Sequence, residues 1–345
     1  MTDWKDFSSR VTLAGLILLL ITGTALLFWY TLDVILIIFF GLLLAILYNG
    51  LCKGLNKRLP MGRTPWLIIL VALSIIGPAA MFWYYGSMLV SQANQLVNSL
   101  AHAGNELLMQ YDFARDLFDD FKSTFNQLSK LDILTNISGF FSTTLGYVFN
   151  ILIIFFVGIY VAFEPDVYVN GLLQLFPKNY QSRIREILRA LNHMLLWWIA
   201  GRLLSMVIIG TLTVIGLLLL GIPLPFTLGV LAALLEFIPY LGPILSAIPA
   251  ILIGLTVNPT TALYVALLYF AIQQLEGYVF TPVIQEETIS LPPAFTVATQ
   301  IIFGLLAGGI GLIMAQPFTA MIVLFIQTFY VQDVLHNDVK LLGEH

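Results

Sequence analysis

Glu236 is a carboxylate inside an apolar stretch, and it is the first residue of this sequence whose type and place suggest chemistry. The stretch 234–255 reads LLEFIPYLGPILSAIPAILIGL and also holds Pro239, Gly242 and Pro243. A carboxylate costs about 2.5–3.5 kcal/mol or more at the centre of a bilayer, so it persists there only when it is protonated, paired, hydrated or functional. Glu236 is therefore a candidate coupling residue, and a structural carboxyl is the alternative.

Glu276 poses the same question in the next apolar stretch, 261–280, which we expect to be a plain span. Gln273 lies three residues earlier and so shares a helix face with Glu276. There is no Lys or Arg from 203 to 339, so both acids lack a cation nearby in sequence unless Arg202 approaches them in three dimensions. A buried carboxyl can exchange a proton near neutral pH, which is the basis for predicting proton coupling. For Glu276, hydration near the membrane interface is the alternative.

Prolines and glycines interrupt two long apolar stretches, 226–255 and 295–326. Non-helical backbone at membrane depth survives only when it is buried in protein or lines a wet cavity. The interruptions therefore predict a cavity where freed carbonyls and helix ends bind a cation or a polar solute. Both stretches begin with Phe-Thr and later contain Ala-x-Pro, a similarity that either an internal repeat or chance would explain. The residues expected to form the breaks are Pro239, Gly242, Pro243 and Pro249 in the first stretch, and Gly308, Gly309, Gly311 and Pro317 in the second.

The composition excludes a soluble domain. Of the 345 residues, 59% are hydrophobic and only 10% are charged, whereas a soluble domain has about 25% charged residues. We expect an all-α polytopic membrane protein with roughly eight membrane segments of about 20 apolar residues each. The two interrupted stretches count among them, and they either cross the membrane or return as re-entrant hairpins. If both return, the C-terminal tail, 336–345, lies in the cytoplasm.

Residues 1–85 are expected to form an N-terminal region of three membrane helices. Their ranges are 11–29, 34–51 and 65–85. A tight turn at 31–33 would join the first two, with Asp33 as the N-cap of the second. The loop after them has four basic residues and no acid, which places it and the N-terminus in the cytoplasm by the positive-inside rule. These basic residues are Lys53, Lys57, Arg58 and Arg63.

Residues 86–138 change character, because they contain six acids against three basic residues and have apolar residues at helical spacing. We expect an amphipathic helical arm outside the membrane, on the extracytoplasmic side. The arm would pack on the membrane part of the protein or on another copy, or would serve as a lid or an oligomerisation element.

Residues 139–335 are expected to form the transport core. An inward crossing at 140–163 should end at Pro165, which follows Glu164. A basic amphipathic helix at 178–195 is expected to lie on anionic lipid in the cytoplasm, before the next crossing. The expected anchors at the membrane interface are Trp197 and Trp198.

The C-terminal half resembles the AI-2E family of membrane transporters, which is named for export of the quorum signal autoinducer-2. The resemblance covers about 140–331, and the earlier helices fit only as a hydropathy pattern. The motif that begins at Glu236 is its most recognisable part. In order, the similar motifs are Leu175-Phe176-Pro177, GRLL at 201–204, GIPLP at 221–225, EFIPYLGP at 236–243, Glu276-Gly277-Tyr278 with Thr281-Pro282, Leu291-Pro292-Pro293, Phe303-Gly304, and GGIGL at 308–312 followed by Ala315-Gln316-Pro317.

The resemblance implies a multi-pass protein of the bacterial plasma membrane that is oligomeric and uses no cofactor. Some members that resemble this chain are described as sodium (or lithium)/proton antiporters and not as signal exporters. In this sequence, Gln285-Glu286-Glu287 stand where the family usually has small polar or basic residues before Leu291. This departure leaves the substrate open.

A secondary transporter driven by a proton or sodium gradient explains the buried acids and the breaks best. Its partners would be membrane lipid, a small solute or a monovalent cation or proton, and further copies of the chain, with no nucleic acid. An enzyme is not expected, because the sequence has no HExxH zinc motif and no membrane Gly-x-Gly-Asp, and a Walker motif is also absent. A passive pore or an oligomeric scaffold without coupled transport is the alternative.

Overall fold

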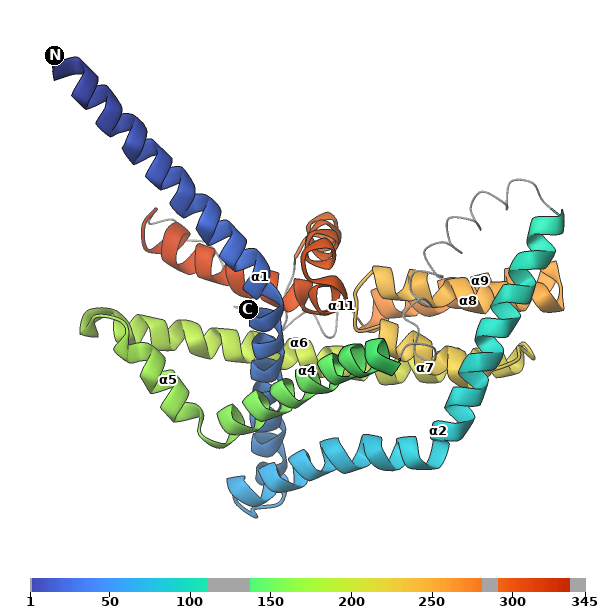
Figure 1. Ribbon diagram of the computed structural model, residues 1–345. Coiled ribbons are helices and arrows are strands. Elements are labelled where there is room, and N and C mark those ends of the chain that lie inside the picture. The colour runs from blue at the N-terminus through green and yellow to red at the C-terminus, as the bar shows by residue number, and fades with distance from the viewer. Residues whose placement is uncertain (1, 111–136, 281–290, 336–345) are drawn as a thin grey trace.

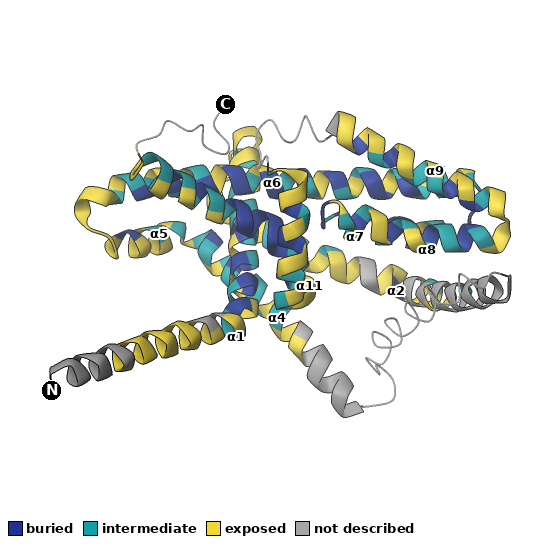
Figure 2. Cartoon of the chain, turned by 90° about the horizontal axis from the view of Figure 1, so that it is seen from above, coloured by how far each residue is buried: buried dark blue, intermediate teal, exposed yellow. Residues whose placement is uncertain are grey.

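The computed structural model describes residues 2–110, 137–280 and 291–335, and these ranges are helical, with no strand among them. Long helices cross near the centre of the molecule, and a group of shorter helices lies to one side (Figure 1). Buried residues concentrate where the long helices cross, as Figure 2 shows. The expectation of an all-α membrane protein is confirmed.

Helix α1 runs without interruption from Thr2 to Arg58. The turn expected at 31–33 is therefore wrong, and Asp33 lies within the helix. Leu32 and Leu36, one helical turn apart, are both buried in the central core, so packing favours a continuous helix there. The earlier part of α1 projects away from the rest of the molecule and is largely exposed (Figure 2).

Helix α2 runs from Arg63 to Gln110, so the third expected crossing does not end at residue 85. Helix α2 contacts α8 (Leu241–Val257), and Gln92, beyond residue 85, accepts a hydrogen bond from the Thr227 hydroxyl. The start of the expected arm thus packs on the protein's own membrane part. The rest of the arm, 111–136, lies outside the described residues, as do the tail 336–345 and the Gln285-Glu286-Glu287 segment.

Helix α4 (Ile137–Phe163) ends where the sequence predicted. Helix α5 (Pro165–Gln174) follows after Glu164 at an angle of 87°, with Pro165 in its first turn. The Arg63 guanidinium donates to the Ala162 carbonyl at 2.7 Å and so fastens the end of α4 to the start of α2. The break at Glu164 is confirmed.

Helix α6 (Lys178–Leu219) joins the expected basic cytoplasmic helix and the following crossing in one element of 42 residues. Helix α7 (Pro225–Leu235) turns back along it, and the two backbones approach closely at Gly210 and Gly229. A Cβ on Gly210 would lie 3.2 Å from the Gly229 carbonyl oxygen. Small residues permit this approach, as is usual between membrane helices.

Helix α8 follows α7 after a break and leads directly into α9 (Pro259–Leu275), which ends in a π-helical turn, η1 (Glu276–Phe280). The Asn258 side chain caps α9 by accepting from the Thr261 amide at 2.7 Å. Helix α8 continues through Pro249, so the break expected at that proline is wrong.

Helix α11 (Pro293–Phe325) continues into a second π-helical turn, η2 (Ile326–Gln332). Its backbone leaves helical geometry at Ala307 and Gly308, as the glycines predicted. No second break occurs at Pro317, which is buried inside the helix, so that part of the prediction is wrong. The segment after Gly308 packs against α1 and α6 in the central core.

Among the described helices, four are long and apolar enough to cross a membrane, or five if the bent pair α4–α5 counts as one span. The four are within α1 (Thr31–Arg58), α2 (Arg63–Met88), α6 and the α11–η2 segment (Pro293–Gln332). Helices α7 and α8 are apolar but shorter. The expected count of about eight segments is thus not confirmed.

Candidate functional site

A cluster of one cation and two carboxylates lies where α6, the α7–α8 break and the end of α9 meet. The Nη1 atom of Arg202 lies 3.6 Å from Glu236 Oε1 and 3.7 Å from Glu276 Oε1. Gln273 donates a hydrogen bond from its amide nitrogen to the other oxygen of Glu276. Both acids singled out from the sequence are thus brought together, with the partner that sequence alone did not place.

The break between α7 and α8 forms a tight hairpin tip that carries Glu236. Glu236 caps the end of α7, and the turn from it to Tyr240 includes a positive φ of 63° at Tyr240. Gly242 follows at a point where a Cβ would lie 1.9 Å from the Leu235 carbonyl oxygen, so only glycine fits there. Pro243 lies in the first turn of α8, where a proline is tolerated.

The two carboxylates differ in their surroundings. The Glu236 side chain is 1% exposed, and neither of its oxygens has a hydrogen-bond partner among the described residues. The Glu276 side chain is 10% exposed and accepts from Gln273. Glu236 is thus paired with the charge of Arg202 and lies beside Glu276, and its oxygens can accept a proton, a cation or a hydrogen bond from water.

The break in α11 forms a second tip with similar construction. Gly308 has a φ of +56°, and a Cβ on Gly311 would lie 1.9 Å from the carbonyl oxygen of Phe303. This matches Gly242 against Leu235 in the first tip. The geometry supports an internal repeat, which the sequence left open beside chance.

Trp198 connects the two broken segments. Its ring packs edge-on against Phe237, which follows Glu236 at the first tip, with centroids 5.6 Å apart. Its Nε1 donates to Gln316 Oε1 at 3.1 Å, in the segment after the second tip. Trp198 lies one turn before Arg202 on α6, so one helix contacts both segments.

The structure tests the expectation that Trp197 and Trp198 are anchors at the membrane interface, and it places four polar residues of α11. Trp198 is 3% exposed and is no interface anchor, whereas Trp197 is 46% exposed. Gln316 accepts a hydrogen bond that joins two helices. Gln300 is fully buried, and its amide atoms have no hydrogen-bond partner within the described ranges. Thr296 and Thr299 instead donate to carbonyls of their own segment.

Arg202 is the residue of the candidate site that the sequence suggested only as a conditional partner of the two acids. The sequence feature that indicates Arg202 is its position. It is the last basic residue before a long stretch that has no Lys or Arg, and the later membrane segments hold two acids. Pro317 and the second tip are linked to the carboxylates through Trp198, which bonds to Gln316 and packs on Phe237. Across the part of the chain that the structure describes, no group of three or more His, Cys, Asp or Glu residues could hold a metal ion.

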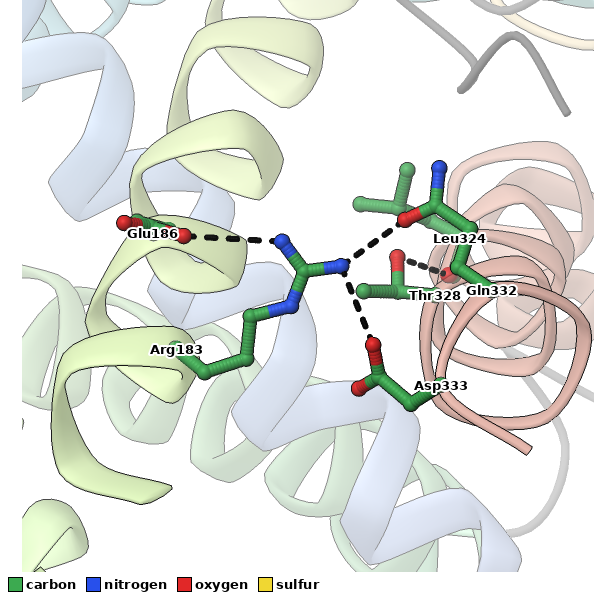
Figure 3. Close-up of polar contacts among 6 residues, drawn as sticks. All are labelled: Arg183, Glu186, Leu324, Thr328, Gln332 and Asp333. Carbon is green, nitrogen blue, oxygen red and sulfur yellow. Dashed lines mark hydrogen bonds and ion pairs between the residues drawn. The ribbon is translucent and has the colours of Figure 1, made fainter. Parts of the chain in front are cut away.

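A second polar cluster joins the start of α6 to the end of η2 (Figure 3). The Arg183 guanidinium donates to Gln332 Oε1 at 2.8 Å and lies 3.3 Å from Asp333 Oδ1. It also pairs with Glu186 on its own helix at 3.5 Å. This cluster lies at the exposed end of α6, so it fastens the C-terminal segment and is separate from the buried site.

Comparison with known proteins identifies the family of the chain. The family model for the AI-2E family transporter matches residues 16–330. Among the relatives, "Putative transport protein YueF" of Bacillus subtilis (strain 168) is 24% identical over 308 residues, 84% of this chain and 83% of its own length. "Putative transport protein YrrI" of the same organism is 30% identical over 167 residues, 48% of this chain and 47% of its own. "AI-2 transport protein TqsA" of Escherichia coli (strain K12) is 22% identical over 327 residues, 90% of each chain. The chain belongs to the AI-2E family of membrane transporters.

Proposed function

We propose that this protein is a secondary transporter in which the Arg202–Glu236–Glu276 cluster exchanges a proton for a monovalent cation, giving Na⁺(Li⁺)/H⁺ antiport. The observation that carries the proposal is one buried arginine between two carboxylates at a hairpin tip. A membrane transporter role follows from the family. Ion coupling is the further step that the charge of the cluster supports.

The charges of the cluster do not balance when all three side chains are ionised, because two carboxylates face one guanidinium. An uncompensated charge is costly away from water. One added monovalent cation balances it, and either a proton on Glu236 or a bound sodium ion meets that need. The proton and the sodium ion then compete for one binding site, and such competition is what an antiporter needs to exchange one ion for the other.

The hairpin tips give the cluster its access to both ions. Helix α7 has 11 residues and so spans about 16 Å, against about 30 Å for the hydrocarbon core. A hairpin of this depth that enters from one side ends near the middle of the membrane. We therefore infer that α7–α8 is re-entrant and that the second tip, in α11, is its counterpart, as paired broken helices are in other transporters.

The placement in the cell follows from the charges at the other end of the molecule. Lys53 and Arg63 at the α1–α2 junction and Arg183 near the start of α6 are basic, and basic loops favour the cytoplasmic side. We infer a bacterial plasma-membrane protein with the α1–α2 junction and the start of α6 on the cytoplasmic side. Because α1 is one continuous helix, the expectation that the N-terminus lies on the same side as this junction is not kept. The remaining coupling candidates, Pro239, Pro243 and Pro317, shape or follow the tips and would contribute through backbone geometry.

A small organic solute is the second candidate cargo. It is favoured by the name of one relative, which is an AI-2 transport protein that spans 90% of this chain. The unpartnered amide of Gln300, in the segment before the second tip, offers a donor and an acceptor to such a solute. In this reading the Arg202 cluster supplies the ion coupling, and the solute occupies the second broken segment.

The proposal is tested by flux into vesicles that contain the purified protein, under an imposed pH gradient. Sodium is followed in one set and an autoinducer-2 mixture in another, for wild type, Glu236→Gln and the control Glu164→Gln. Glu164 is an exposed acid between α4 and α5 with no side-chain capping bond. Gradient-driven flux that is lost only in Glu236→Gln supports coupling at the cluster.

Flux that ignores the pH gradient would instead indicate a passive pore. No flux of either solute, with a stable folded protein, would favour an oligomeric scaffold. In both cases Glu236 would be a structural carboxyl, and the proposed coupling would be wrong.

A further inference from the structure

Two adjoining cavities lie between α1, the α4–α5 break and α6. The first has a volume of about 360 Å³ and an apolar lining that includes Phe39, Leu42 and Leu172. The second, of about 430 Å³, is lined by polar groups that include Lys53, Asn56 and Arg63. They share Asn49, Pro165 and Asn192, so together they form one site with an apolar part and a basic part.

The polar part carries a net positive charge. Lys53 and Arg63 are both exposed there, and within the described ranges the Lys53 ammonium forms no ion pair or hydrogen bond. The Arg63 guanidinium already donates to Asn49 and to the Ala162 carbonyl, so it is held in place. The neighbouring acids Glu164 and Asp166 do not line either cavity.

The geometry points to a binding site for an anionic phospholipid, with its phosphate at Lys53 and Arg63 and one acyl chain in the apolar cavity. A basic group beside a membrane attracts anionic headgroups, and amide groups such as Asn49 and Asn192 add hydrogen-bond partners for phosphate and glycerol oxygens. An acyl chain gains little free energy by leaving the bilayer for an apolar cavity. The headgroup therefore determines which lipid binds more tightly, and the cavity determines whether an acyl chain can be accommodated.

The position of the site suggests what bound lipid would stabilise. The lining includes Met321 and Phe325 of α11 as well as residues of α1, α5 and α6. A lipid there would simultaneously contact the N-terminal helices and the part of α11 that follows the second tip. The sole cysteine, Cys52, is buried at this site with its thiol directed to the Arg63 carbonyl at 3.3 Å, so it is not accessible for lipidation.

Binding is tested on the full chain in detergent micelles by native mass spectrometry, with phosphatidylglycerol and phosphatidylcholine added in matched amounts. We expect tighter retention of phosphatidylglycerol. Lys53→Gln should weaken its binding by about fivefold, the equivalent of about 1 kcal/mol for one lysine at a membrane surface. Lys57→Gln is the matched control, since Lys57 is exposed one turn later on α1 but does not line the cavity.

The apolar part is tested by filling it. Leu172→Trp should reduce retention of the lipid, whereas Val167→Trp, on the same helix but outside the lining, should not. Soluble glycerol 1-phosphate should fail to displace the lipid. Equal binding of both lipids, equal effects of Lys53→Gln and Lys57→Gln, or displacement by glycerol 1-phosphate would overturn the two-part site. None of these readouts depends on transport.

Discussion

Removing the cation from the buried cluster should destabilise the protein more than removing a carboxylate. Arg202→Gln leaves Glu236 and Glu276 facing each other without compensation. Their contacting oxygens are at most 7.3 Å apart, because they lie 3.6 and 3.7 Å from the same nitrogen atom. At a pH at which both carboxylates are ionised, the substitution thus turns a cluster with one excess negative charge into one with two.

The size of the effect follows from these distances. At an effective dielectric constant of about 20, each Arg–Glu attraction is worth about 4–5 kcal/mol and the Glu–Glu repulsion at least about 2 kcal/mol. Removing one partner of a buried ion pair costs about 3–5 kcal/mol after relaxation. We expect Arg202→Gln to lower the free energy of unfolding by about that amount. Glu236→Gln, which leaves the Arg202–Glu276 pair balanced, should change it by less than about 1 kcal/mol.

The assay is SDS-induced unfolding in mixed micelles, followed by tryptophan fluorescence. Arg202→Gln/Glu236→Gln should recover at least half of the loss seen in Arg202→Gln, because it restores the original excess charge. Arg189→Gln, an exposed position on the same helix, should change stability by about 0.5 kcal/mol or less. Wild-type stability of Arg202→Gln, or a further loss of stability on adding Glu236→Gln, would contradict this prediction.

Three further predictions concern the tips and their fastenings. Gly242→Ala should abolish flux and destabilise the protein, because the new Cβ would lie 1.9 Å from a backbone oxygen. Gly277→Ala should be tolerated, because the new Cβ would have no neighbour within 4 Å. Thermal unfolding and vesicle flux check both variants. Trp198→Phe keeps an aromatic ring but leaves the side-chain oxygen of Gln316 without its hydrogen-bond donor. The free energy of unfolding in SDS should fall by about 1–3 kcal/mol. Arg183→Gln should change stability by about 1 kcal/mol or less, since its pairs are exposed, yet should speed hydrogen exchange at 326–335.

Each of these three predictions has a control variant or a result that would contradict it. An active Gly242→Ala protein would show that the first tip is not as tightly closed as described. Trp197→Phe serves as the exposed comparison for Trp198→Phe, and equal losses in both would remove the connecting role of Trp198. Arg185→Gln is the comparison for Arg183→Gln, because Arg185 bonds to Asn170 of α5 and not to the C-terminal segment. Faster exchange at 326–335 in both variants would count against the fastening.

Local sequence signals predicted the breaks where proline or glycine changes the backbone itself. The turn at Glu236–Tyr240, the end of α4 at Glu164 and the break at Gly308 were all read correctly, because φ restriction and missing donors act within a few residues. Pro249 and Pro317 show the limit of the same signal. Both lie in helices that packing holds straight enough to continue, and a proline in a membrane helix need not end it.

The continuity of long helices and the identity of the acids' partner could not be read locally. The short polar residues near Asp33 suggested a turn, but the buried face that includes Leu32 and Leu36 holds α1 helical through it. Arg202 lies 34 residues before Glu236 and 74 before Glu276 along the chain. Their meeting depends on α7 folding back along α6 and on α9 running alongside it, which is a property of packing between elements.

Sodium-induced proton release tests the central claim most directly. Purified protein in a weakly buffered detergent solution is titrated with sodium chloride while a pH-sensitive dye reports released protons, with choline chloride as the salt control. If a proton and a sodium ion compete for the Arg202–Glu236–Glu276 cluster, wild type releases protons as sodium binds, and Glu236→Gln does not. Sodium binding without proton release in wild type, or equal release in Glu236→Gln, would contradict the account.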